Sequence, residues 1–194
     1  LRPRILRNVR HVDPSTKILG IPSALPFYIT ATALGRMGHP DGELNLTRAA
    51  ARTGLIQMIP TLSSVSFDEM VDARDEKGAP VQFFQLYVSA DRNVVADMLR
   101  RAEGANVKAI FVTVDAPQLG RREQDMRMHF VDEGSNVQAG NVENRDEGAA
   151  RAISSFIDPS FDWDDVLWMK RQTHLPILLK GVQTWEDAVQ AYEM

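Results

Sequence analysis

The sequence predicts an α/β fold in which a parallel sheet is built from alternating strands and helices. Two observations predict it. Short apolar runs rich in Val, Ile and Phe recur along the 194 residues, and they are too short to be free-standing helices. Segments with helical spacing of apolar residues separate these runs, as crossovers between parallel strands require. About five such β–α units result, and an open doubly wound sheet and a (β/α) barrel both fit them.

Each predicted element rests on its own local signal. The apolar runs predict strands at Phe27–Ile29, Ile56–Met58, Val81–Tyr87, Ala109–Val114 and Ile177–Leu179. Helical spacing predicts helices at Glu43–Arg52, Phe67–Arg74, Asn93–Glu103, Trp163–Gln172 and Trp185–Met194. Residue types that cap helix starts occur at Asp91, Asp162 and Thr184. Glycines that commonly end a helix occur at Gly54, Gly78 and Gly104.

Two long segments do not follow this alternation. Leu1–Pro26 is rich in proline, so we expect it to be irregular or to form an edge. Residues 116–160 form a long polar loop after the fourth strand, and a disordered insertion or a functional lid would both explain it. The chain starts at Leu1, and no Gly or Pro stop follows the last predicted helix, so we expect a piece of a longer protein.

The composition excludes several classes of function. The absence of cysteine excludes disulfides, thiol nucleophiles and thiolate metal sites. A net charge of −4 argues against a dedicated nucleic-acid binder, which usually needs a basic stripe. No apolar run approaches the roughly 18 residues that span a bilayer, so we expect no membrane span. The sequence contains no dinucleotide-binding glycine motif or P-loop, and its histidines lack the spacing of a metal site.

Polar side chains occur at the end of every predicted strand. In chain order, the groups are Thr30 to Ala33, Thr61 to Ser64, Gln85 with Tyr87, Thr113 with Asp115, and Lys180. Strands often end in polar loop residues, so one such end carries little weight. Because ligands of α/β proteins bind at the carboxyl ends of the strands, five polar ends together predict one shared polar site.

Lys180 and Asp115 are the most informative members of this set. Lys180 directly follows the apolar run Ile177–Leu179, so we expect it to face an anion or an electron-rich cofactor. The ordinary alternative is a lysine that extends along the rim to water. Asp115 also follows an apolar run, and we expect it to be paired or to take part in chemistry. Arg121 and Arg122 follow shortly after, and one of them can bind a carboxylate with two parallel hydrogen bonds.

Several motifs together resemble the FMN-dependent α-hydroxy-acid dehydrogenase family. In chain order they are Pro26-Phe-Tyr-Ile-Thr-Ala-Thr-Ala, Phe84-Gln-Leu-Tyr-Val, Phe111-Val-Thr-Val-Asp-Ala-Pro, Leu119-Gly-Arg-Arg-Glu and Leu179-Lys-Gly-Val. Residues 153–160 are most similar to the L-lactate dehydrogenase (cytochrome), or flavocytochrome, branch, and glycolate oxidase is the next most similar. The resemblance implies a TIM (β/α)8 barrel present only in part. Residues 1–194 would then be a partial FMN hydroxy acid dehydrogenase domain.

The resemblance also implies a role for individual residues. The residues that contact FMN would be Ala31, Thr32, Ala33, Ser63, Gln85, Thr113 and Lys180. Tyr87 and Arg122 would bind the substrate, and the catalytic set would be Tyr87, Asp115 and Lys180. In this set, Asp115 would orient the catalytic histidine of the family and Lys180 would lie beside flavin N1. A fixed cation there stabilises the reduced flavin.

The activity that the resemblance implies is oxidation of a small (S)-2-hydroxy acid such as lactate to the 2-keto acid, with a hydride equivalent passing to flavin N5. Oxygen, a heme or cytochrome c would accept the electrons. The family's catalytic base lies in a His-Gly-Gly-Arg loop, and that motif does not occur in this sequence. We therefore expect little or no turnover from the chain alone, because a general base typically contributes about 10²–10⁴-fold.

An alternative function is a non-catalytic flavin-binding or interaction module derived from half of a barrel. For the parent enzyme we expect a homo-oligomer that does not bind nucleic acid. The mitochondrial intermembrane space, the peroxisome and the cytoplasm all stay open as its location.

Overall fold

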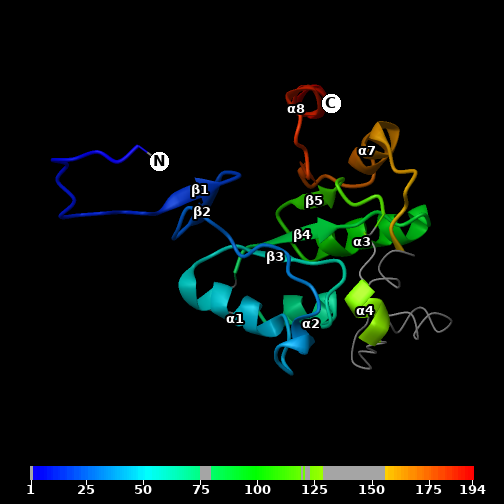
Figure 1. The fold of residues 1–194 in the computed structure, drawn as a ribbon, viewed down its shortest axis with the longest axis horizontal. Coiled ribbons are helices and arrows are strands. Elements are labelled where there is room, and N and C mark those ends of the chain that lie inside the picture. Colours follow the sequence, from blue (N-terminus) through cyan, green and yellow to red (C-terminus); the bar gives the residue numbers. More distant parts are fainter. Residues whose placement is uncertain (1, 75–79, 119, 121–122, 129–155) are drawn as a thin grey trace.

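The computed structural model describes residues 2–74, 80–118, 120, 123–128 and 156–194 (Figure 1). Its centre is a parallel sheet whose strands follow one another in chain order. The strands are β3 (Gln57–Ile59), β4 (Gln82–Leu86), β5 (Ile110–Thr113) and β6 (Ile177–Lys180). The last four predicted strands are thereby confirmed, and each end differs by at most one residue.

The first predicted strand, Phe27–Ile29, is wrong as a strand. Ile29 alone pairs with the sheet, through a parallel bridge to Gln57 in which Ile29 N donates to Ile56 O at 2.8 Å. Pro26 has no N–H to donate and Phe27 is 54% exposed, so the residues before Ile29 do not extend the ladder. The bridge nevertheless places the chain after Ile29 next to β3.

The strand order bears on the two architectures that the residues left open. A doubly wound sheet reverses its strand order at a switch point, where its ligand binds. Here β3, β4, β5 and β6 lie in chain order, and each of the three pairings is parallel. This arrangement is consistent with part of an α/β barrel, in which every strand lies beside its neighbours in sequence.

All the predicted helices form, with ends shifted by a few residues. They are α1 (Leu44–Thr53), α2 (Phe67–Asp72), α3 (Arg92–Gly104), α7 (Trp163–Lys170) and α8 (Trp185–Glu193). Asp91, Asp162 and Thr184 accept hydrogen bonds from main-chain N–H groups of the first turns, as N-caps do. Gly54 ends α1 with a φ of +67°, whereas α3 includes Gly104 and is capped by Ala105. Gly78 lies outside the described residues.

The two faces of the sheet pack against different partners, because side chains alternate along each strand. One face lies beneath the helices and contains Ile59, Phe84, Leu86, Ile110 and Val112, packed with Met70, Val95, Leu99 and Met169. The opposite face, called the inner face below, contains Met58, Phe83, Phe111 and Leu178, packed with Ile18, Ile21 and Tyr28. The rings of Phe83 and Phe111 lie 5.2 Å apart on this inner face.

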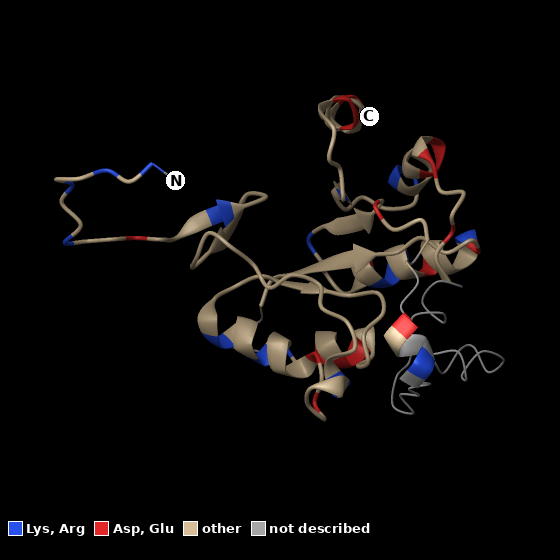
Figure 2. Cartoon of the chain, in the orientation of Figure 1, with Lys and Arg blue, Asp and Glu red and all other residues tan. Residues whose placement is uncertain are grey.

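The N-terminal segment is only partly irregular. Strands β1 (Thr16–Ile18) and β2 (Ile21–Ser23) form an antiparallel hairpin, so the prediction is wrong for these residues. Leu19 and Gly20 form its two-residue loop, with φ values of +52° and +77°, which suits a tight hairpin turn. Residues 2–15 have no regular structure and extend away from the sheet (Figure 1). Figure 2 colours the arginines of this segment blue, at the far left of the view.

In its described residues, the polar segment after β5 contains a helix that the sequence did not predict. Helix α4 (Glu123–Met128) forms in it, with an ion pair between Arg127 and Glu123. Residues 129–155 lie outside the described part of the chain, so the two interpretations of this loop stay untested. A single turn of 3-10 helix, η1 (Gly35–Met37), follows the Ile29 bridge. None of the described helices is long and apolar enough to cross a membrane.

Candidate functional site

The carboxyl ends of the four strands meet at one edge of the sheet. Thr61 follows β3, Tyr87 follows β4, Asp115 follows β5 and Lys180 is the last residue of β6. Because all pairings are parallel, these residues lie on the same edge. The structure thus places four of the five predicted polar ends at one edge, and the fifth, Thr30 to Ala33, follows the Ile29 bridge beside β3.

Three polar side chains continue the inner face at this edge. Gln85 lies two residues beyond Phe83 in β4, and Thr113 lies two residues beyond Phe111 in β5, so both share the inner face. Thr113 is paired in register with Lys180. Gln85 Nε2 donates to Thr113 Oγ1 at 2.9 Å, and both side chains are buried. Three adjacent strands therefore contribute an amide, a hydroxyl and an ammonium group in one row.

Lys180 and Asp115 form a long ion pair beside this row. Lys180 Nζ lies 4.0 Å from Asp115 Oδ1, and the two side chains are 40% and 42% exposed. A pair of this length and exposure contributes little to stability. Lys180 Nζ can therefore donate to a bound ligand without losing a strong internal contact. An ionised Asp115 likewise has more acceptor capacity than this one contact uses.

The main chain of Gly181 packs closely against the side chain of Asp115. Its φ is +116°, and a Cβ built on it would lie 2.6 Å from both Cβ and Cγ of Asp115. Real Cβ atoms essentially never come this close to another heavy atom. The Lys180-Gly181 sequence therefore gives a charged residue followed by the one residue type that leaves room for the aspartate.

Glu43 anchors the two loops that enter the site from β3 and from the Ile29 bridge. Its buried carboxylate accepts hydrogen bonds from Gly35 N at 2.8 Å, Ser64 Oγ at 2.7 Å, and the main-chain N–H groups of Ser64 and Val65. Burial alone would raise the pKa of Glu43, but the hydrogen bonds from Gly35 and Ser64 outweigh it and hold the pKa below its ordinary value. The carboxylate is therefore stable as a buried anion.

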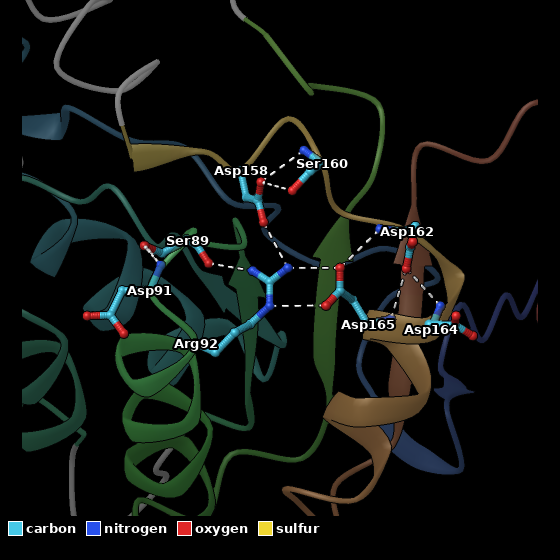
Figure 3. Close-up of polar contacts among 8 residues, drawn as sticks. All are labelled: Ser89, Asp91, Arg92, Asp158, Ser160, Asp162, Asp164 and Asp165. Atoms are coloured by element: carbon cyan, nitrogen blue, oxygen red, sulfur yellow. Dashed lines mark hydrogen bonds and ion pairs between the residues drawn. The ribbon is translucent and has the colours of Figure 1, made fainter.

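A second polar cluster, centred on Arg92, holds residues 157–165 near the carboxyl edge of the sheet. Arg92 Nη2 lies 2.8 Å from Asp158 Oδ2 and 2.8 Å from Asp165 Oδ2, and Arg92 Nη1 donates to Ser89 O (Figure 3). Ser89 forms an antiparallel bridge with Ile157. The cluster joins α3, α7 and residues 157–158. Ile157 and Phe161 then line a small cavity together with Thr113 and Val114.

The remaining predicted site residues have different surroundings, and one of them lies outside the described residues. Ala31 packs against the inner face, and the hydroxyl of Thr32 donates to Thr30 O at 3.5 Å. Ser63 is buried, but its neighbour Ser64 makes the contacts with Glu43. Tyr87 N donates to Thr61 Oγ1 at 3.0 Å, and its side chain is partly exposed. Arg122 lies outside the described residues, and Ala33 lies exposed in the loop after the bridge.

Sequence reasoning missed how three residues organise the site: Thr61, Glu43 and Arg92. Thr61 was visible as a polar residue after a strand, but its partners depend on the β3–β4 register. Glu43 has the place of an acidic residue at a helix start, which is ordinarily exposed. Arg92 has the place of a solvated residue in the first turn of α3. In the described part of the chain, no group of three or more His, Cys, Asp or Glu side chains could hold a metal ion.

A parallel sheet with hydrogen-bond donors at its carboxyl edge belongs to the class of α/β proteins that bind a ligand there. Within that class, the chain belongs to the FMN-dependent dehydrogenase family, which it matches over residues 1–194. FMN is the cofactor of this family.

Curated relatives include the L-lactate dehydrogenase (cytochrome) of Wickerhamomyces anomalus and the glycolate oxidase of Spinacia oleracea. The first is 48% identical over 98% of this chain and 33% of the relative. The second is 42% identical over 96% of this chain and 52% of the relative. The chain thus spans between a third and about half of the length of these relatives.

Solved structures resemble the chain over nearly its whole length. The flavin-binding domain of baker's yeast flavocytochrome b2 has a TM-score of 0.81 and 43% identity, covering 99% of this chain and 45% of that one. A mandelate oxidase has a TM-score of 0.84 and 35% identity, covering 99% of this chain and 55% of that one. The relatives are named for lactate, glycolate and mandelate, which are all 2-hydroxy acids.

The donor set at the sheet edge fits FMN. The flavin ring presents carbonyl oxygens and ring nitrogens that accept hydrogen bonds, and Gln85 Nε2, Thr113 Oγ1 and Lys180 Nζ are donors on one face. The Gln85 and Thr113 side chains are buried, so the hydrogen bonds that they make are shielded from competition by water. The fit rests on this row of donors.

Proposed function

We propose that this chain is the FMN-binding part of an enzyme that oxidises a small (S)-2-hydroxy acid, such as lactate, to the 2-keto acid. Its sheet would be part of a TIM barrel. The observation that carries the proposal is the row of Gln85, Thr113 and Lys180 on adjacent strands, next to Asp115. Membership of the FMN-dependent dehydrogenase family supports the choice of cofactor.

The residues of the row would hold the flavin by its acceptor edge. Lys180 adds a positive charge, which favours binding of an electron-rich ring and of its reduced, anionic form. The main chain at Ala31, Thr32 and Ala33, together with Ser63, would contact the ring from the neighbouring loops. When bound, FMN supplies the electron-accepting group of the reaction.

The substrate would bind on the same edge. Tyr87 provides a phenol for a hydrogen bond to the hydroxy acid, and Arg122 would bind its carboxylate with two parallel hydrogen bonds, which aligns the carbon that is oxidised. Asp115 would orient a histidine base and stabilise the imidazolium that forms when the base takes the substrate proton. The resemblance places that histidine in a His-Gly-Gly-Arg loop, which this sequence does not contain.

Flavin binding and turnover test the proposal separately. The purified chain is titrated with FMN while flavin fluorescence and the visible spectrum are recorded. We expect saturable binding with a perturbed flavin spectrum. With lactate and a redox dye, we expect little or no dye reduction, because general-base catalysis is missing. No FMN binding would refute the proposal, and robust turnover would refute the assigned need for the histidine loop.

Oxygen, a heme or cytochrome c could accept the electrons of the whole enzyme, and its assembly as a homo-oligomer belongs to the same proposal. Stopped-flow reoxidation of the reduced full-length protein by each acceptor would identify the physiological one. Sedimentation of the same protein would give its oligomeric state.

A further inference from the structure

Thr61 joins the loop after β3 to the end of β4. Its Oγ1 donates to the main-chain oxygen of Gln85 at 2.5 Å and accepts from Tyr87 N at 3.0 Å. The hydroxyl therefore acts both as a donor, to Gln85 in β4, and as an acceptor, from Tyr87 directly after β4. These two bonds hold the main chain of Thr61 against the end of β4.

The main chain of Thr61 then determines which way the Gln85 amide faces. Thr61 N donates to Gln85 Oε1 at 3.3 Å. A main-chain N–H can only donate, so the Gln85 atom that faces it has to be the carbonyl oxygen. Gln85 Nε2 consequently faces the other way and donates to Thr113 Oγ1 at 2.9 Å.

This orientation decides what Thr113 can offer to a ligand. Because its oxygen accepts the bond from Gln85, its own proton stays available to be donated. If the amide were turned over, Gln85 Oε1 would take that proton and the row would present an acceptor in place of donors. The direction of the hydrogen bonds from Thr61 through Gln85 to Thr113 thus matches a ligand that is rich in acceptors.

We propose that Thr61 is a positioning residue for FMN, because it orients the Gln85 amide and, through Gln85, the proton of the Thr113 hydroxyl. The site then presents donors to the acceptor atoms of the flavin ring, although Thr61 need not touch the ring. The proposal rests on the proposed function, since it takes FMN as the ligand. It adds a residue to which the resemblance assigns no role.

The test compares Thr61→Val, which keeps the shape of the side chain and removes its hydroxyl, with Thr61→Ser, which keeps the hydroxyl. The side-chain amide signals of Gln85 are followed by NMR, and FMN affinity is measured by fluorescence titration. We expect Thr61→Val to shift the Gln85 signals, to weaken FMN binding about tenfold and to change the spectrum of bound flavin. Thr61→Ser should restore all three.

Thr173→Val is the matched control. The Thr173 hydroxyl also donates to one partner, Glu103 Oε2 at 3.1 Å, and accepts from Leu175 N at 3.2 Å. It lies before β6, at the opposite end of the sheet from the site. Thr173→Val should lose about as much stability as Thr61→Val. It should nevertheless leave the Gln85 signals unchanged and keep the FMN affinity within about twofold of that of the unchanged chain. Should Thr61→Val not fold, Thr61→Cys replaces it, since a thiol is a weak donor of similar size.

The outcomes separate the two proposals. Unchanged Gln85 signals in Thr61→Val would overturn the positioning role, as would an equal loss of FMN affinity in Thr61→Val and Thr173→Val. If the unchanged chain binds no FMN while the Gln85 signals still respond to Thr61→Val, the proposed function fails and the control of the amide by Thr61 stands.

Discussion

A Cβ on Gly181 would lie 2.6 Å from the Cβ of Asp115, so the two residues fit together only because position 181 has no side chain. The contact connects the end of β6 with the residue after β5, across the edge where the donor row lies. It also ties the position of Asp115 to the conformation of the main chain that follows Lys180.

Gly181→Ala should therefore displace Asp115. The new methyl group would clash with the aspartate, and the φ of +116° is strained for any residue with a Cβ. We expect a loss of about 2–4 kcal/mol in the free energy of unfolding, measured by urea denaturation. Gly104→Ala is the control, because that glycine lies in α3 with nothing within 4 Å of its built Cβ, and it should gain about 0.5–1 kcal/mol. Equal effects at the two positions would contradict the close fit.

Lys180→Met should weaken FMN binding without unfolding the chain. The ion pair with Asp115 is long and exposed, so its removal costs little stability. The lost positive charge should raise the Kd for FMN by about 10–100-fold in a fluorescence titration. Lys108→Met serves as the control, since Lys108 precedes β5 at the other end of the sheet and is exposed. Equal affinities for the two variants would argue against Lys180 as a flavin contact.

Glu43→Gln should destabilise the site loops in a pH-dependent manner. Glutamine has one acceptor oxygen and would direct N–H groups at main-chain donors. We therefore expect the free energy of unfolding to fall by about 2–3 kcal/mol near pH 7. The pKa of Glu43 is lowered in the folded chain, so its stabilising contribution is complete above the unfolded value of 4.5 and is lost as the pH falls through the folded pKa.

The stability difference between the unchanged chain and Glu43→Gln should therefore shrink on acidification below pH 4.5. Urea denaturation at a series of pH values measures it. Glu186→Gln is the control, because this glutamate lies exposed in the first turn of α8. A difference that stays constant with pH would show that Glu43 does not act as a buried anion.

Arg92→Met should leave two carboxylates facing each other without a cation. Asp158 is 7% exposed and Asp165 is 22% exposed, so the free energy of unfolding should fall by about 2–4 kcal/mol. Residues 157–160 should also become looser, because Arg92 holds Asp158 in place (Figure 3). Hydrogen exchange at Asp158 N, which donates to Val88 O, reports the loosening. Arg100→Met breaks an exposed ion pair with Asp97 and should change stability by less than about 0.5 kcal/mol. Protection of Asp158 N that persists in Arg92→Met would exclude this role.

The elements that sequence could predict are those whose signals are local. Runs such as Ile177–Leu179 form strands because they are short, apolar and bounded by turn residues, and Asp162 caps α7 through its own two hydrogen bonds. The hairpin was missed because its turn contains Leu19 with a φ of +52°, a conformation that a leucine does not signal. Helix α4 was missed because it is six residues long and polar.

The site was predictable in its members and unpredictable in its connections. Gln85, Thr113 and Lys180 come together because the carboxyl ends of adjacent parallel strands have to meet, which follows from strand positions alone. Thr61 acquires its partners through the register between strands. Glu43 contacts Ser64, which lies 21 residues away in sequence, and no local pattern encodes that distance.

The unbroken chain order of the strands has a consequence for how the protein is made. A nascent chain leaves the ribosome from its N-terminus, and domains form as their segments emerge. Here each of β4, β5 and β6 adds to the strand immediately before it, so β3 with β4 can serve as a template while Ile110 and later Ile177 are still being translated. Each of these three strands can therefore add to a strand that has already been synthesised, at one growing edge of the sheet.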